Sequence, residues 1–297
     1  MATPLNEPLA TLEARAHRIR RLAVRMGQVQ GQGYIGQALD IADVLAVAYF
    51  RSMRWRADEP GWEGRDRFLL SNGHYAIALY AALIEAGIIA ESELETYGSD
   101  DSRLPMSGMS SYTPGMEMSG GSLGQGLAIA VGHALGLKRK GSSSFVYTLF
   151  SDGELDEGAM WEGFMSAAHH RLDNLVAICD VNNQQADGPS GQVMAFEPLA
   201  AKMEAFGWHT QRVDGNDLAA LEKAVAAGVK EKTKPSLIIV RTHIGYGSPN
   251  KNNTGDVHGS PLGDDEIKLT KKQLGWDVGH RPPVPLSRSD GAGSVML

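Results

Sequence analysis

Cysteine is almost absent from this sequence, which holds a single one, Cys179, in 297 residues. A disulfide framework within the chain is therefore excluded, and a reducing, cytoplasmic compartment is the simplest expectation. No run of about 18 apolar residues occurs, so no membrane span is expected. The opening residues, MATPLNEPLA, lack the basic segment and apolar stretch that mark a secretion signal.

Positive charge is also in short supply. Lys and Arg number 28 against 35 Asp and Glu, which gives a net charge of −7. This balance argues against a nucleic-acid partner, because such partners are bound by clustered positive charge. An acidic chain can still bind a phosphorylated ligand if local backbone amides or a metal ion meet the phosphate.

Several arginines gather near the N-terminus, where apolar side chains recur at helical spacing and predict an amphipathic helix. The apolar positions are Leu12, Ile19, Leu22 and Met26. The arginines are Arg15, Arg18, Arg20, Arg21 and Arg25. We interpret these arginines as the solvated face of the helix, in preference to a transit peptide or a nucleic-acid patch.

Helical and strand-like segments alternate through the middle of the chain. Strands are predicted at 145–150, 175–180, 208–213 and 236–241. Helices are predicted at 33–50, 72–88, 123–140 and 216–230, with a long loop at 99–122. A further helix is predicted after the turn at 151–158 and runs to about His170. This alternation predicts a parallel sheet with right-handed crossovers. We expect an α/β fold with a doubly wound, mostly parallel sheet flanked by helices, whose ligand lies beyond the carboxyl ends of the strands.

The domain boundary is predicted near the C-terminus. One domain is expected over residues 1–278, and Pro, Gly and Ser dominate residues 279–297. Such a composition is typical of a linker-like tail. A chain that finishes in a linker suggests one half of a larger assembly.

Polar residues follow two consecutive predicted strands. Asp152 and Gly153 come after the strand at 145–150, and Asn182 comes after the strand at 175–180. In a parallel sheet both positions project into one crevice. A carboxylate, an amide oxygen and a free backbone carbonyl suit a hard cation such as Mg²⁺. By composition alone an acidic surface turn followed by an Asn-rich loop is about equally consistent.

Six short words in the sequence resemble those of transketolases, thiamine-diphosphate enzymes, in the right order and with near-normal spacing. They are LSNGH (70–74), GMEMSGGSLGQG (115–126), DGELDEG (152–158), HIGYGS (243–248), VHGSPLGDDEI (257–267) and QLGWD (273–277). The Asp-Gly pair followed about thirty residues later by Asn-Asn resembles the diphosphate-binding motif of such enzymes. The resemblance covers about residues 10–280 and implies the thiamine-diphosphate-binding fold and both cofactors, thiamine diphosphate and Mg²⁺.

The resemblance also implies roles for individual residues. The Mg²⁺ ligands would be Asp152, Asn182 and the backbone carbonyl of Gln184, with Ca²⁺ or Mn²⁺ able to substitute. The implied cofactor-binding residues are His74, Gly121, Leu123, Asp152, Gly153, Glu154, Asn182, Ile244 and His258. His74, His258 and Glu157 are implied as catalytic, the histidines because a neutral imidazole suits proton transfer near neutral pH. Glu157 corresponds to part of a proton network linking two active sites.

Three positions depart from the family pattern. Ser151 stands where the family usually has glycine, which an ordinary backbone conformation would allow. Tyr34 stands in place of a histidine, and the segment 104–110 (LPMSGMS) lacks another. Both missing histidines resemble substrate-contacting positions, so the cofactor site is better supported than the usual sugar-phosphate donor.

The resemblance further implies a missing half, because full-length transketolases continue after QLGW into a pyrimidine-binding domain. We expect a second, C-terminal subunit carrying that domain, an α2β2 assembly, sugar-phosphate substrates and transfer of a two-carbon ketol unit to an aldose. The Met-rich loop 106–118 is a candidate contributor to the interface between the chains. An ordinary active-site loop is about equally consistent.

Two other functions remain open. The chain could belong to another thiamine-diphosphate enzyme, such as a 2-oxoacid dehydrogenase component or a deoxyxylulose-phosphate synthase, since Tyr34 and the missing loop histidine weaken the case for a ketose donor. It could also be a non-catalytic subunit that scaffolds a partner. The Asp152 and Asn182 pair counts against a scaffold.

Overall fold

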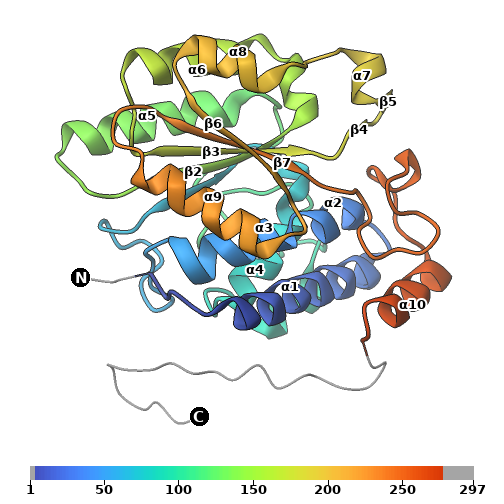
Figure 1. Ribbon diagram of the computed structural model, residues 1–297. Coiled ribbons are helices and arrows are strands. Elements are labelled where there is room, and N and C mark those ends of the chain that lie inside the picture. Colours follow the sequence, from blue (N-terminus) through green and yellow to red (C-terminus); the bar gives the residue numbers. More distant parts are fainter. Residues whose placement is uncertain (1–3, 277–297) are drawn as a thin grey trace.

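A five-stranded sheet forms the centre of the molecule. The computed structural model describes residues 4–276, and Figure 1 shows the sheet between two layers of helices. The strands, in spatial order, are β1 (Arg67–Leu70), β2 (Val146–Ser151), β3 (Leu175–Val181), β7 (Ser236–Arg241) and β6 (His209–Asp214). Every neighbouring pair is parallel, which confirms the predicted fold class.

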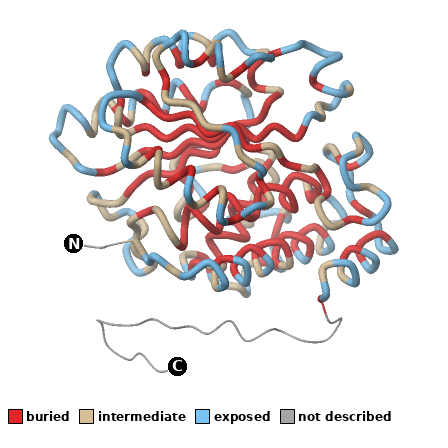
Figure 2. The backbone as a smooth tube through the Cα atoms, in the orientation of Figure 1, coloured by how far each residue is buried: buried red, intermediate tan, exposed pale blue. Residues whose placement is uncertain are grey.

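Helices cover both faces of the sheet, so its central strands are buried on both sides, as Figure 2 shows. One face is covered by α1 (Leu9–Gln30), α2 (Ile35–Asp40), α3 (Ala42–Val47), α4 (Ala76–Glu85) and α9 (Leu218–Lys230). The other is covered by α5 (Gln125–Arg139), α6 (Gly158–His169) and α8 (Leu199–Phe206). Burial on both faces explains why β2, VYTLFS, is largely apolar and buried throughout.

The remaining elements gather at the carboxyl edge of the sheet or beside it. They are the two-residue strands β4 (Gln184–Gln185) and β5 (Gly188–Pro189), α7 (Ser190–Val193) and α10 (Asp264–Gln273). Figure 1 places them on the same side of the molecule, beyond the ends of β3 and β7. Within residues 4–276, none of the helices has the length and apolar character that crossing a membrane requires.

The N-terminal helix has the predicted apolar stripe, but the interpretation of its arginines was partly wrong. Arg15 and Arg20 are buried. Arg15 pairs with Glu7 at 2.8 Å and Glu85 at 2.6 Å, and Arg20 pairs with Asp43 of α3. A guanidinium can be buried here because acids on other segments neutralise it. These arginines therefore fasten α1 to its neighbours, which a single helical stripe could not reveal.

Several segments differ from the predicted elements, among them α8, which was not predicted. The helix predicted at 33–50 is two short helices, α2 and α3, separated at Ile41, whose backbone (φ −91°, ψ 2°) leaves the helical region. Strand β1 was not predicted, because its four residues follow a polar stretch and are too few to show a pattern. The tail predicted at 279–297 lies outside the described residues.

Candidate active site

The ends of β2 and β3 bring the predicted metal ligands together. Ser151 of β2 is paired in register with Asp180 of β3, so Asp152 and Asn182 follow at the same edge of the sheet. The backbone N–H of Asn183 donates to Asp152 Oδ2 at 2.9 Å, which ties the two strand ends directly. Asp152 and Asn182 are both 1% exposed. Parallel pairing thus brings the two strand ends together, as the strand order predicted.

The carboxylate of Asp152 is partly satisfied and partly free. Its Oδ2 accepts hydrogen bonds from Asn183 and from Ser190 Oγ, the latter at 2.9 Å. Its Oδ1 is buried and has no hydrogen-bond partner among residues 4–276. Burial, and then the nearby charge of Asp180, raises the pKa of Asp152 to about 7. A cation at Oδ1 would supply the missing partner and hold the carboxylate ionised.

The carboxylate of Asp180 holds several side chains at the same edge of the sheet. Its carboxylate accepts hydrogen bonds from Thr242 Oγ1, from Tyr75 Oη at 2.9 Å and from Asn182 Nδ2 at 3.0 Å. Burial raises the pKa of Asp180 to about 6. Because Asn182 uses its Nδ2 on Asp180, its Oδ1 is aimed away from that acid; Oδ1 accepts from the Gln184 N–H at 3.0 Å. The hydrogen bonds to Asp180 and from Gln184 thus fix the orientation of the Asn182 carboxamide.

Hydrogen bonds to the Glu154 side chain fix the turn after β2. Ser151 and Glu154 form a reciprocal capping box at the start of the 3₁₀ turn Asp152–Asp156. The Glu154 carboxylate is fully buried and also accepts from Ser71 Oγ and from the Gly124 N–H at 2.8 Å. Its side chain therefore joins three loops and is not free for a cofactor. Ser151 fits the place of the family's glycine because it caps this turn.

A second group of predicted residues forms an aromatic cluster. The ring centroids of His74 and His258 are 6.1 Å apart, and the ring of Tyr34 lies 4.7 Å from His74 and 6.0 Å from His258. Burial lowers the pKa of His74 to about 4, and burial also lowers the pKa of His258. Both imidazoles are consequently neutral at physiological pH, so each can accept a proton.

The glycine-rich loop lies directly on the segment that carries His74. A Cβ added to Gly73 would lie 2.5 Å from the backbone of Gly120 and Gly121, so only glycine allows this approach. Gly121 has φ +132° and is exposed, and Leu123 is half-buried. Ile244 is fully buried. Glu157 is exposed at the start of α6, and its charge contributes to the raised pKa of the buried Glu154.

The residues present fit a hard cation. Among residues 4–276, no group of three His, Cys, Asp or Glu side chains converges on a metal position. The predicted set has one carboxylate, one amide oxygen and one backbone carbonyl, so a bound Mg²⁺ would complete its coordination with phosphate oxygens or water. The free Asp152 Oδ1 is the observation that favours this arrangement.

Comparison with known proteins decides the family. The sequence profile of the transketolase thiamine-diphosphate-binding domain matches residues 12–287. The chain belongs to the transketolase family. It is 67% identical, over 80% of its length, to an uncharacterized transketolase family protein of Sinorhizobium fredii. It is 39% identical, over 82% of its length, to a 6-deoxy-6-sulfo-D-fructose transketolase subunit of a Clostridium species.

A crystal structure of a transketolase mutant from Pichia stipitis superposes with a TM-score of 0.88, at 31% identity over 92% of this chain. The chain spans 86% and 89% of the Sinorhizobium and Clostridium relatives. It spans only 42% of the Pichia transketolase. It thus corresponds to one half of a full-length transketolase and to nearly all of two shorter family members.

Four further buried polar residues on the elements around the candidate site were not singled out by sequence reasoning. They are Gln37, Asp40, Asn72 and Asp180, all at most 1% exposed. Neither polar side-chain atom of Gln37, Asp40 or Asn72 has a hydrogen-bond partner in the described part of the chain. Only Asn72, beside the LSNGH histidine, stood in a recognisable word. The others come from α2 or from within a strand, where nothing in the sequence marks a site.

Proposed function

We propose that this chain is the N-terminal, diphosphate-binding subunit of a thiamine-diphosphate- and Mg²⁺-dependent transketolase. The complete enzyme would transfer a two-carbon ketol unit from a ketose phosphate to an aldose. The observation that carries the proposal is the buried edge formed by Asp152 and Asn182, with an unpartnered carboxylate oxygen in a transketolase-family domain.

The proposed metal site uses three residues. Asp152 Oδ1, Asn182 Oδ1 and the backbone carbonyl of Gln184 would hold Mg²⁺, and the backbone at Gly153 would meet the diphosphate. Support comes from the burial of both side chains and from Asp180, which fixes the orientation of Asn182. Bound thiamine diphosphate supplies a ring that stabilises a carbanion during carbon–carbon cleavage.

The two histidines have a separate proposed role at the other end of the site. His74 and His258 are kept neutral by burial, so each can accept a proton from a substrate hydroxyl or share a hydrogen bond with a carbonyl oxygen. Tyr34, which contacts both rings, narrows the space beside them. Gly121, Leu123 and Ile244 remain proposed contacts to the cofactor rings.

A second chain is proposed to complete the enzyme. This chain matches less than half of the Pichia transketolase but nearly all of a Clostridium protein whose name calls it a subunit. We infer a C-terminal partner that carries the pyrimidine-binding domain, in an α2β2 assembly. Glu157, exposed at the start of α6, would then meet a neighbouring chain. The Met-rich loop is a weaker interface candidate, because Met116 and Met118 are buried while Tyr112 is 55% exposed.

The proposal is tested by ketol transfer from xylulose 5-phosphate to ribose 5-phosphate. The assay contains thiamine diphosphate and Mg²⁺, with this chain alone and then with its partner subunit. Activity only in the mixture is expected. Since one relative is named for a sulfonated ketose, 6-deoxy-6-sulfo-D-fructose is included as a second donor.

Two other outcomes would redirect the proposal. Decarboxylation of pyruvate with an artificial electron acceptor, and no cleavage of any ketose, would favour a 2-oxoacid enzyme. Failure of the paired chains to bind thiamine diphosphate with Mg²⁺ in calorimetry would favour a scaffold subunit.

A further inference from the structure

Helix α2 runs along the candidate cofactor site from one end to the other. At its start, the ring of Tyr34 lies 4.7 Å from that of His74. At its end, Asp40 is close enough to Asp180 and Asn182 for both to influence its pKa, which burial raises well above the usual value. Six residues of helix cover about 9 Å, so α2 links the histidine end of the site to the metal end.

Gln37 lies midway along this helix and faces the site. Positions three residues before and after a helical residue lie about 60° to either side of it, and for Gln37 these are Tyr34 and Asp40. Ile35 and Leu39, about 160° around α2 from Gln37, are apolar and enter the core. The Gln37 side chain therefore points between the histidine cluster and the buried acids.

The carboxamide of Gln37 is left unsatisfied by the chain. Its side chain is fully buried, and neither Nε2 nor Oε1 has a hydrogen-bond partner among residues 4–276. Gln211 on β6 provides a contrast, because its Nε2 donates to the Ala224 carbonyl at 2.9 Å. A buried amide without partners costs free energy in the folded chain and calls for a specific explanation.

We propose that Gln37 is a cofactor-binding residue, whose Nε2 donates a hydrogen bond to a diphosphate oxygen of the bound cofactor. This inference rests on the proposed function. The diphosphate is the part of the cofactor that would lie between the histidine end and the metal end, and an amide N–H suits an anionic oxygen. The unsatisfied Gln37 amide thus destabilises the cofactor-free chain. Its hydrogen bond to the cofactor removes this cost on binding.

The binding test uses calorimetry on the full chain mixed with its partner subunit and Mg²⁺, with two probes, thiamine diphosphate and thiamine, which lacks the phosphates. Gln37→Met keeps the side-chain length and removes the donor. It should weaken thiamine diphosphate binding roughly ten- to a hundredfold and leave thiamine binding unchanged. Gln37→Glu should weaken thiamine diphosphate further, because it places a carboxylate beside the diphosphate. Gln211→Met is the matched control and should bind both probes as the wild type does.

Thermal unfolding of the cofactor-free chain provides a second, independent readout. Gln37→Met should keep or raise the melting temperature, because it removes an unsatisfied amide, whereas Gln211→Met should lower it by removing a satisfied one. A drop for Gln37→Met as large as that for Gln211→Met would overturn the inference, since Gln37 would then have partners within the chain.

The outcomes separate the inference from the proposed function. Unchanged thiamine diphosphate affinity in Gln37→Met, with a wild-type chain that binds, overturns the role of Gln37 and leaves the proposed function intact. Paired wild-type chains that bind no thiamine diphosphate with Mg²⁺ overturn both. Equal losses for thiamine and thiamine diphosphate would also overturn the inference, because they would reflect a distorted site rather than a lost phosphate contact.

Discussion

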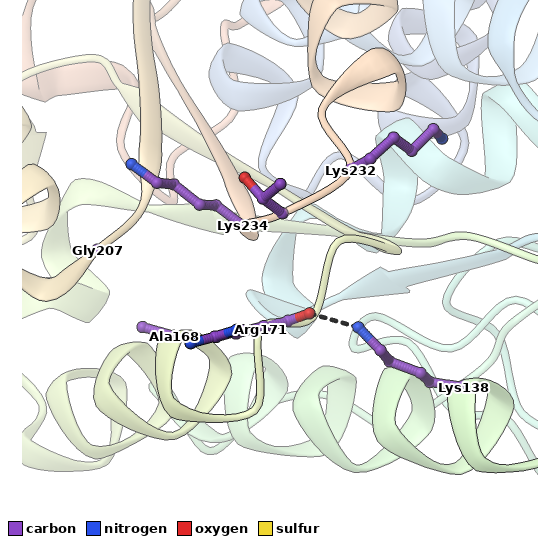
Figure 3. A pocket seen from close by; sticks show the side chains of 7 residues that line it. Lys138, Ala168, Arg171, Gly207, Lys232 and Lys234 are labelled. Carbon is purple, nitrogen blue, oxygen red and sulfur yellow. Dashed lines mark hydrogen bonds between the residues drawn. The ribbon is translucent and has the colours of Figure 1, made fainter.

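The two edges of the central sheet carry charge in opposite ways. At the carboxyl edge, Asp40, Asp152 and Asp180 are buried together. At the amino edge, a cavity of about 510 Å³ is bordered by four exposed cationic side chains. Figure 3 shows these cations, which are Lys138, Arg171, Lys232 and Lys234.

The two edges differ in whether their polar atoms have hydrogen-bond partners. Lys138 donates to the Arg171 carbonyl at 2.5 Å and to Asp173 at 2.6 Å, and Lys232 donates to the Val229 carbonyl. These cations also remain in contact with water, so their charge costs little. At the carboxyl edge water is excluded and several polar atoms have no partner among residues 4–276. The amino edge has one such buried atom, Asn174 Oδ1, so the number of buried polar atoms without partners, rather than the amount of charge, distinguishes the carboxyl edge.

The largest effect is expected from Asp152→Asn at the carboxyl edge. Loss of the charged oxygen should weaken Mg²⁺-dependent binding of thiamine diphosphate by on the order of a hundredfold or more, since Mg²⁺ requires strong oxygen donors. Calorimetry on wild type and variant measures this change. Asp173→Asn, at the amino edge, is the matched control. Equal affinity in wild type and Asp152→Asn would remove Asp152 from the metal site.

A smaller effect is expected from Asp180→Asn, which leaves the proposed ligands in place. The variant weakens the support of Asn182, and loss of such an outer partner typically costs roughly ten- to a hundredfold in metal affinity. Titration of Mg²⁺ at saturating thiamine diphosphate measures it. Normal metal affinity together with reduced stability would instead make Asp180 purely structural.

The third effect is a pH dependence of folding that originates at His74. Burial holds its folded pKa at about 4, below the unfolded value of 6.5, so the unfolded chain binds more protons between those values. This contribution to stability is present above pH 6.5 and is lost as pH falls toward 4, about 1–2 kcal/mol between pH 7 and pH 5. Urea unfolding at both pH values should show a smaller loss in His74→Gln than in wild type.

The control for this pH effect is His170→Gln, at the exposed end of α6. That variant should keep the wild-type pH dependence. Identical pH dependence in wild type and His74→Gln would mean that His74 is not held neutral by the fold.

The smallest effect is expected at the amino edge. Lys138→Met removes an exposed ion pair with Asp173 and should change the free energy of unfolding by about 1 kcal/mol or less. Thiamine diphosphate affinity should not change. A loss of thiamine diphosphate affinity in Lys138→Met would mean that the amino edge also contributes to cofactor binding.

The sequence predicted the placement of those candidate residues whose position follows from strand order. Four of the five main strands were expected, and parallel pairing then places Asp152 beside Asn182 without further information. The residues that escaped prediction depend on packing between distant segments. Asp40 and Gln37 reach the site only because α2 packs beneath the loop of Gly245, whose N–H donates to the Gly36 carbonyl at 2.9 Å. Periodicity reports which face of a helix is apolar, but not what lies opposite its polar face.

The register of β2 and β3 has a consequence for how such enzymes evolve. Both side chains proposed to bind the metal lie on one strand–helix–strand unit, β2, α6 and β3, whose strands align Ser151 with Asp180. If a long chain is divided into two subunits after this domain, the strand–helix–strand unit stays in one subunit. Both proposed metal-binding side chains then stay together. The family includes a relative of which this chain spans 89% and another of which it spans 39%.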